Sequence, residues 1–295
     1  MYKYDSCLVC GQTQFSTKFI AKDYTVSGEE FQIQSCDSCK FLFTNPRPDT
    51  ERLGNYYKSE DYISHSDTSR GLINKLYKFV RIFTLRSKFK LIQQYANKGE
   101  VLDIGAGTGA FVNYLKEKGF TAVGIEPEED ARAQAKRLYN LDFKTEASLN
   151  HVADYSYSAI TMWHVLEHVP ALKERIAELC RLVTKDGVVV IAVPNHESLD
   201  ALHYKEKWAA YDVPRHLYHF DKQSIKSLFE ASGFDLVDIC PMHFDSFYVS
   251  MLSEKYKGNN ALGLLNAFFV GLKTFFIGGR KNSSSLIYIF KPKTH

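Results

Sequence analysis

The pattern of apolar and polar positions changes at about residue 100. From there onward, short apolar runs alternate with segments whose apolar residues recur every three or four positions. Short runs are typical of buried strands, and the wider spacing is typical of helices. Strands that alternate with helices form a parallel sheet covered on both faces, so the pattern predicts an α/β fold with a doubly wound sheet. The expected strands are 101–104, 121–126, 159–163, 187–193, 234–240 and 286–290, and the expected helices are 110–118, 128–138, 171–182 and 222–232.

Four of the six cysteines lie within the first 40 residues. Cys7 and Cys10 form one C-x2-C pair, and Cys36 and Cys39 form another after 25 intervening residues. Each pair can place two thiolates on one tight turn, and two such turns complete a tetrahedral zinc site. A segment of about 45 residues buries too little core to be stable alone, so a metal is physically motivated. We therefore predict a structural zinc ribbon, rather than two disulfides in a secreted protein.

These patterns divide the chain into three parts. Residues 1–45 form the zinc-ribbon module, with short strands expected at 15–20 and 31–34. Residues 46–98 form a linker and a basic helical connector, because Pro46 and Pro48 mark a break and the apolar residues of 72–96 have helical spacing. Residues 99–295 form the α/β domain, with a helical insertion at about 246–280.

Composition excludes a disordered or fibrous protein, since 45% of the 295 residues are hydrophobic and 24% are charged. The net charge of +3 gives no reason to expect nucleic acid as a partner. The charge is unevenly placed, however, because residues 70–99 and 255–295 are basic and contain no acidic residue. Both segments also carry apolar helical stripes, which leaves three interpretations open: a cap on the substrate pocket, a dimer contact, or contact with an anionic membrane. The oligomeric state stays open.

The N-terminus lacks the apolar stretch behind a basic start that marks a signal peptide. The longest apolar stretch, 261–277, is interrupted by Asn266 and Lys273 and is shorter than the ~20 residues that span a bilayer. We therefore expect a cytoplasmic protein, with the inner face of the membrane as the alternative location. In that compartment thiols stay reduced, so Cys180 and Cys240, which stand in apolar runs, are expected in the core.

A glycine loop is the sharpest signal in the chain. The apolar strand that ends at Ile104 continues as Gly105-Ala106-Gly107-Thr108-Gly109 and then as a helix. Glycines allow positive φ and let a ligand approach the backbone, and the following helix offers free N–H groups and a partial positive charge. Glu126 ends the next strand, where its carboxylate can accept both hydroxyls of a ribose. A nucleoside cofactor is therefore predicted at this loop, in preference to a purely structural turn.

Two nucleoside cofactors fit these residues. Gly105, Gly107 and Ala110 also satisfy the dinucleotide fingerprint G-x-G-x-x-G/A. Asp103, two residues before the first glycine, favours S-adenosylmethionine, because that cofactor carries an ammonium group and a nicotinamide dinucleotide does not. The G-x-G-x-G spacing and the strands that follow favour it as well.

Residues 100–240 resemble the class I S-adenosylmethionine-dependent methyltransferases. The resemblance rests on 103–109, on Glu126, on the strand 159–163 with Leu166-Glu167-His168-Val169 after it, and on Val193-Pro194-Asn195. It implies a Rossmann-like methyltransferase sheet and an enzyme that uses this cofactor. The cofactor-binding residues that it implies are Asp103, Gly105, Ala106, Gly107, Gly109, Glu126, Pro127, Ala147 and Trp163.

Residues 212–220 are similar to a segment of bacterial methyltransferases of cell-surface glycan and small-molecule pathways. Some of these, including sugar C-methyltransferases, also begin with a four-cysteine zinc module. The resemblance implies a small-molecule or glycan acceptor, and we expect methylation on oxygen rather than carbon. The alternatives are an RNA methyltransferase and a non-catalytic cofactor-binding or scaffold protein.

Six of the ten histidines fall between residues 164 and 219 and follow the expected strands, at the edge where α/β sheets bind ligands. A neutral imidazole can accept the proton of an acceptor hydroxyl. His216 is the predicted base, with Arg215 as the group that orients the acceptor and His164 as a further catalytic candidate. The alternative is that these histidines only bond the backbone of a packed lid. His164 to His168 also reads as H-x-x-E-H, a metallopeptidase zinc motif, but the helix that this motif needs is not expected here.

Overall fold

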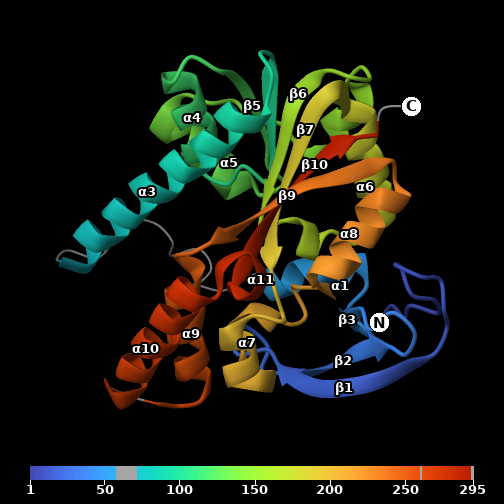
Figure 1. Cartoon of the computed structure of the whole chain (residues 1–295), viewed down its shortest axis with the longest axis vertical. Helices are drawn as coiled ribbons and strands as arrows, with labels where there is room; N and C mark the ends of the chain where they lie inside the picture. Colours follow the sequence, from blue (N-terminus) through green and yellow to red (C-terminus); the bar gives the residue numbers. More distant parts are fainter. Residues whose placement is uncertain (58–71, 260, 294–295) are drawn as a thin grey trace.

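The computed structural model of the chain describes residues 1–57, 72–259 and 261–293 (Figure 1). Residues 58–71 of the predicted connector therefore lie outside the described part. Of the rest of that connector, a short helix α1 (Thr50–Leu53) and a 3₁₀ turn η1 (Gly54–Tyr57) follow the proline pair, and α3 (Leu72–Tyr95) confirms the expected basic helix.

The central sheet has six strands in the order β5-β4-β6-β7-β10-β9. Its strands are β4 (Glu100–Ile104), β5 (Thr121–Ile125), β6 (Tyr157–Trp163), β7 (Val183–Pro194), β9 (Phe234–Met242) and β10 (Ser285–Pro292), which confirms all six predicted strands. The strands β5, β4, β6 and β7 are parallel, whereas β10 is antiparallel to both of its neighbours. The expectation of a parallel sheet thus fails at β10. The helical insertion starts where β9 ends, so the chain enters β10 from that same end and runs back.

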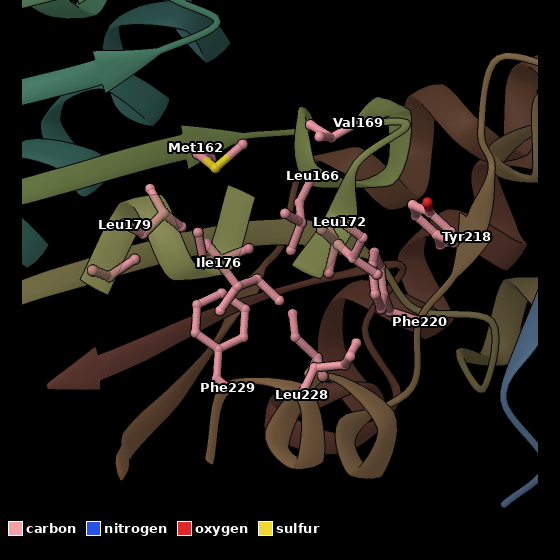
Figure 2. Packing of buried hydrophobic residues seen from close by; sticks show 14 of the residues in the cluster. Met162, Leu166, Val169, Leu172, Ile176, Leu179, Tyr218, Phe220, Leu228 and Phe229 are labelled. Carbon is pink, nitrogen blue, oxygen red and sulfur yellow. The ribbon is translucent and has the colours of Figure 1, made fainter. Parts of the chain in front are cut away.

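Helices cover both faces of this sheet, as predicted. On one face lie α3, α4 (Ala110–Glu117) and α5 (Glu129–Tyr139), whose apolar residues pack on β4, β5 and β6. On the other lie α6 (Leu172–Leu182) and α8 (Lys222–Ala231). Figure 2 shows Ile176 and Leu179 of α6 beside Leu228 and Phe229 of α8, packed beneath Met162 of β6. These apolar stripes, spaced at helical periodicity, fix which helix face meets the sheet.

A second sheet has four strands in the order β1-β2-β3-β8. The first three are β1 (Phe15–Lys22), β2 (Glu30–Cys36) and β3 (Leu42–Thr44), while β8 (Tyr218–His219) comes from the segment after β7. Leu42 pairs with His219 and Phe43 with Tyr218. The predicted strands of the N-terminal module are therefore present, but its sheet is completed by residues far along the chain.

The remaining elements gather at one end of the central sheet. They are α7 (Leu199–Tyr204), α9 (Asp245–Tyr256), α10 (Ala261–Ile277) and α11 (Gly279–Asn282), with 3₁₀ turns η2 (Glu146–His151), η3 (Leu166–His168), η4 (Lys205–Lys207) and η5 (Ala209–Tyr211) between the main elements. Figure 1 places α7, α9, α10 and the four-stranded sheet below the central sheet, at the end toward which β7 points. The predicted helical insertion is thus present. In the described part of the chain, no helix combines the length and apolar character that a membrane span requires.

Candidate active site

The glycine loop joins β4 to α4 and has the backbone that the sequence predicts. Gly105 and Gly107 have φ values of +73° and +54°, in the left-handed region where glycine is favoured. A Cβ on Gly105 would meet Cγ2 of Val165 at 2.3 Å, whereas one on Gly107 would meet no described atom within 4 Å. Gly105 is thus required by packing, and Gly107 leaves open space where a ligand can approach the backbone.

Glu126, directly after β5, closes the other side of this loop. Its carboxylate accepts hydrogen bonds from the backbone N–H of Gly107 at 2.7 Å and of Glu128 at 3.0 Å. The side chain is buried, and burial raises its pKa. The carboxylate is therefore fixed next to the open side of Gly107, where its unused lone pairs can accept ribose hydroxyls.

Asp103, on β4, lies beneath the loop. Its side chain is 2% exposed, and its carboxylate accepts a hydrogen bond from the hydroxyl of Thr161 at 2.5 Å. Burial raises the pKa of Asp103 to about 6. A buried carboxylate with one neutral donor is a favourable partner for a cation, which fits the ammonium group of the predicted cofactor.

A lysine that the sequence analysis did not select stands beside this carboxylate. Lys88, on α3, places its Nζ 4.3 Å from the ring centroid of Trp163, and burial lowers its pKa to about 8. The negative charges of Asp103 and Asp245 oppose this effect, because they favour the protonated form of Lys88. It lies three residues after Leu85 and four before Ile92, both of which pack on the sheet, so its place on the inner face of α3 was a usable signal.

The other expected cofactor residues have different positions. Trp163 is buried at the end of β6, and within the described part of the chain its Nε1 has no hydrogen-bond partner. Ala106 is buried in the loop, and a Cβ on Gly109 would meet Leu141 Cδ1 at 2.9 Å, so that glycine serves helix packing. Pro127 and Ala147 are exposed, after β5 and on η2.

A cavity of about 410 Å³ opens at the carboxyl ends of β6 and β7. His164, His168 and His216 contribute to its wall, together with Asp245 of α9 and Tyr24 of the turn between β1 and β2. Further residues of α9 and of η5 also line it. Concave, partly apolar cavities with a few convergent polar groups are the usual form of small-molecule sites.

The structure brings His216 and His168 together. Their ring centroids are 4.5 Å apart. Nδ1 of His216 lies 2.8 Å from the carbonyl of Ala210, which can only accept, so Nδ1 is the donor of that bond. Nδ1 of His168 lies 3.2 Å from the carbonyl of Arg215 and 2.9 Å from the hydroxyl of Tyr57, which can donate or accept. Burial, with repulsion from His216, lowers the pKa of His168 to about 4.

His164, the further catalytic candidate, is held differently. Its Nε2 lies 2.8 Å from a carboxylate oxygen of Asp245, and its Nδ1 lies 3.3 Å from one of Glu167. Burial opposes charge on the ring, but Asp245 and then Glu167 outweigh it and raise the pKa of His164 to about 10. The ring is therefore an imidazolium at neutral pH, with no lone pair to accept a proton.

Arg215 does not reach the cavity, so the prediction that it binds the acceptor is wrong. The side chain is fully buried, and its guanidinium donates to Asp212 at 2.6 and 3.0 Å, to Asp23 at 2.9 Å, and to the Tyr56 carbonyl at 2.9 Å. These bonds join the N-terminal sheet and the connector to the loop that carries His216. Arg215 is a positioning residue for the cavity.

The four N-terminal cysteines converge. The Sγ atoms of Cys7 and Cys39, and those of Cys10 and Cys36, are 3.5 Å apart, and all four lie within 4.8 Å of one another. None of them is in a disulfide. Four thiolates at ~2.3 Å from a tetrahedral zinc ion would lie roughly 3.8 Å apart, close to these separations.

Comparison with known proteins identifies the family. A sheet with a glycine loop at its carboxyl edge and a buried acidic pair defines a nucleoside-binding α/β protein. Residues 78–239, more than half of the chain, match the family model described as methyltransferase domain. The chain belongs to this family of S-adenosylmethionine-dependent methyltransferases and is therefore an enzyme, which argues against the non-catalytic alternative.

Curated relatives match parts of the chain. An uncharacterized methyltransferase of Staphylococcus carnosus is 29% identical over 148 residues, which are 47% of this chain and 72% of the relative. The demethylmenaquinone methyltransferase of Tropheryma whipplei is 27% identical over 39% of this chain, and the human mitochondrial ubiquinone biosynthesis O-methyltransferase is 23% identical over 50%. The matches span about half of the lengths of these last two relatives, 50% and 44%.

Solved structures confirm the fold alone. A possible histamine N-methyltransferase of Thermotoga maritima aligns with 75% of this chain and 96% of its own, with a TM-score of 0.52 and 16% identity.

Proposed function

We propose that this enzyme transfers a methyl group from S-adenosylmethionine to a hydroxyl oxygen of a small molecule or glycan bound in the 410 Å³ cavity. The observation that carries the proposal is that the predicted cofactor site and the cavity are adjacent along the chain. Trp163 belongs to the cofactor edge, and the next residue, His164, lines the cavity and bonds Asp245. An acceptor in the cavity would therefore lie against the cofactor edge, which is the positioning that methyl transfer requires.

The residues of the cofactor edge fit S-adenosylmethionine. Glu126 would accept the ribose hydroxyls, Gly107 offers the open backbone, and the buried carboxylate of Asp103 would face the ammonium group. The indole of Trp163 would wall the site. When bound, this cofactor supplies a methyl group already activated on a sulfonium sulfur, so the chain has to orient the acceptor and exclude water.

His216 would then receive the proton of the acceptor hydroxyl. Its Nδ1–H bond to Ala210 turns the lone pair of Nε2 away from that carbonyl, and the ring borders the cavity. A positioned base contributes ~10²–10⁴-fold in rate. The name of the human relative, an O-methyltransferase, supports oxygen as the methylated atom.

Release of S-adenosylhomocysteine in the presence of candidate hydroxyl acceptors tests this proposal. His216→Ala should lower turnover at least tenfold and leave cofactor affinity within about twofold. Asp103→Ala and Glu126→Ala should weaken cofactor binding in calorimetry. His203→Ala, at an exposed histidine outside the cavity, is the matched control. Unchanged turnover in His216→Ala would remove that histidine from the mechanism.

We also propose that the cysteine cluster holds a structural zinc ion. The sulfur separations, the absence of disulfides among the described cysteines and the small size of the module support it. Elemental analysis of the purified full chain should give one tightly held zinc, which Cys10→Ser should release and Cys180→Ser should retain. A chain free of zinc in the wild type would contradict the proposal.

We further propose that α10 rests on an anionic membrane surface. Its exposed apolar side chains form a continuous face, and basic residues accompany them along this part of the chain. The exposed apolar residues are Leu262, Leu264, Leu265, Phe268, Phe269, Phe276 and Ile277. Lys273 is the one charged residue of α10, and Lys255, Lys257, Arg280 and Lys281 flank the helix, so exposed apolar side chains and nearby positive charge would together favour an anionic lipid surface. Vesicles with anionic lipid should co-sediment the protein, and Phe269→Ser with Phe276→Ser should release it, whereas Leu202→Ser on α7 should not. Sedimentation independent of anionic lipid, or a dimer that hides this face, would contradict it.

A further inference from the structure

Three side chains at the cavity form a cluster of potential metal ligands that the proposed function does not explain. One ring nitrogen of His168, one of His216 and a carboxylate oxygen of Glu167 lie within 4.8 Å of one another. Glu167 and His168 come from η3, directly after β6, and His216 comes from the loop before β8. The backbone N–H of Leu217 donates to the carbonyl of Glu167 at 2.8 Å, which holds the two segments together.

Glu167 is the unexplained member of this cluster. Its side chain is 0% exposed, yet neither carboxylate oxygen has a hydrogen-bond partner among the described residues. Its closest recorded polar contact is the Nδ1 of His164 at 3.3 Å. That contact joins Oε1 to the imidazolium of His164, whereas Oε2 has no recorded polar contact in the described part of the chain, and a buried carboxylate oxygen without a partner costs free energy. The geometry therefore leaves Oε2 available to an additional ligand.

The two imidazoles are oriented as metal ligands are. Nδ1 of His216 donates to the carbonyl of Ala210, and Nδ1 of His168 lies 3.2 Å from the carbonyl of Arg215 and 2.9 Å from the hydroxyl of Tyr57. Bonds of this kind fix a ring and, when Nδ1 carries the proton, leave Nε2 with the lone pair, which is the usual outer-shell arrangement around metal-bound histidines.

We infer that Glu167, His168 and His216 bind a divalent transition-metal ion at the wall of the acceptor cavity. Two imidazole nitrogens and one carboxylate favour ions such as Mn²⁺, Fe²⁺ or Co²⁺ and leave coordination positions open. Because both histidines line the cavity, oxygens of an acceptor can occupy those positions.

This inference rests on the proposed function and revises one part of it, the role of His216. A metal ion bound to the acceptor hydroxyl would lower its pKa, so the proton would leave to solvent and Nε2 of His216 would be a ligand instead of the base. Acceptors with two neighbouring oxygens would then be favoured, since they can fill two open positions at once.

The site is distinct from the cysteine cluster in chemistry, and this permits a selective experiment. Mn²⁺ suits nitrogen and oxygen ligands, whereas thiolates prefer softer ions. The full chain, with its cysteine cluster loaded, is titrated with Mn²⁺ and the free ion is counted by electron paramagnetic resonance. We expect about one bound Mn²⁺ per chain, and at least tenfold weaker binding in Glu167→Gln and in His216→Ala. His203→Ala, a histidine outside the cluster, should bind like the wild type.

Each outcome decides the inference. Loss of binding in both ligand variants but not in His203→Ala supports it, provided that thermal unfolding shows the variants to be folded. If Glu167→Gln does not fold, His216→Ala alone decides. Absence of binding in the wild type, or equal binding in every variant, overturns it. Calorimetry with S-adenosylhomocysteine on metal-free protein separates the two proposals. Intact cofactor binding together with turnover in the absence of metal would contradict the metal site alone. Absence of cofactor binding would contradict the proposed function.

Discussion

The cofactor edge and the acceptor cavity differ in how far along the chain their parts lie. Asp103, the glycine loop and Glu126 fall within one β-α-β unit, and the bonds of Glu126 are made inside it, whereas Asp103 also bonds Thr161 of β6. The cavity instead draws Tyr24 from the turn between β1 and β2, His216 from the loop before β8 and Asp245 from α9. A local site depends on the backbone of one turn, whereas a site assembled from distant segments depends on whatever holds those segments together.

Two devices hold the cavity together. The cysteine cluster fixes the turns at the ends of the N-terminal sheet, and β8 joins that sheet edge to edge. The Arg215 guanidinium then connects Asp23 of the same module with Asp212, next to the histidine loop. The N-terminal module therefore contributes Tyr24 to the wall of the cavity and Asp23 to the bonds that hold Arg215. This difference gives a series of tests in which one site fails and the other survives.

The largest expected effect is that of Cys36→Ser. Cys36 is fully buried in the cluster, so the change should release zinc and lower the free energy of unfolding of the N-terminal module by more than about 5 kcal/mol. Turnover should be lost, because Tyr24 and the Arg215 contacts leave the cavity wall. Affinity for S-adenosylhomocysteine, measured by calorimetry, should stay within about threefold. A parallel loss of cofactor affinity would show that the two regions are not separable.

Arg215→Met should have the next largest effect. Removing the guanidinium leaves the buried carboxylates of Asp23 and Asp212 without their cation, and breaking such a pair costs about 3–5 kcal/mol. Chemical denaturation should report that loss, with KM for the acceptor raised and cofactor affinity retained. A double variant that also carries Asp23→Asn should recover part of the stability. Full stability in Arg215→Met alone would contradict the positioning role.

Gly105→Ala should have the opposite selectivity and weaken cofactor binding, because the change lies in the glycine loop. The residue has φ of +73°, and a Cβ would meet Val165 at 2.3 Å. Backbone strain and overpacking together should lower the free energy of unfolding by about 2–4 kcal/mol and weaken cofactor binding. Gly119→Ala is the matched control, since it has φ of +84° but no described atom within 4 Å of a Cβ, and should cost about 1 kcal/mol. Equal effects would remove the packing argument.

The same contrast explains what the sequence could predict. The strand, the glycine turn and Glu126 stand within some 25 residues, so the local geometry of the turn was predictable, whereas the nearby Lys88 and the antiparallel direction of β10 were missed. The pairing of His164 with Asp245 could not be predicted, because the two residues lie 81 residues apart. The predicted acceptor contact of Arg215 failed because Asp23 lies 192 residues away. Charge alone marks such residues as candidates, and only the fold decides whether a charge faces a ligand or another buried charge.

The role of η3 shows a further limit of motif reading. The spacing H-x-x-E-H suggested ligands on one helix, and it was set aside because no helix was expected there. The structure has a short 3₁₀ turn at that place, and it directs Glu167 and His168 toward His216 from another loop. A spacing rule that assumes one secondary structure cannot recognise ligands that a tertiary contact brings together.

The smallest expected effect is the contribution of Asp103 to the pH dependence of folding stability. Burial raises the pKa of Asp103 from 3.8 to about 6 in the folded protein. The charged form is therefore disfavoured by folding, and the penalty is fully present above pH 6. As the pH falls from about 6 toward about 4, the folded chain takes up a proton before the unfolded chain does, so this contribution becomes less unfavourable.

Comparison of the wild type with Asp103→Asn isolates that contribution. Between pH 7 and pH 5, the free energy of unfolding of the wild type relative to the variant should rise by roughly 1 kcal/mol, measured by urea denaturation. Affinity for S-adenosylhomocysteine should move in the opposite direction and fall below pH 6, because a protonated Asp103 no longer attracts the ammonium group. If the difference in the free energy of unfolding between the wild type and Asp103→Asn stays constant from pH 7 to pH 5, Asp103 does not titrate in this range. If cofactor affinity also stays constant while stability shifts, the carboxylate titrates without facing the cofactor, and the ammonium contact is wrong.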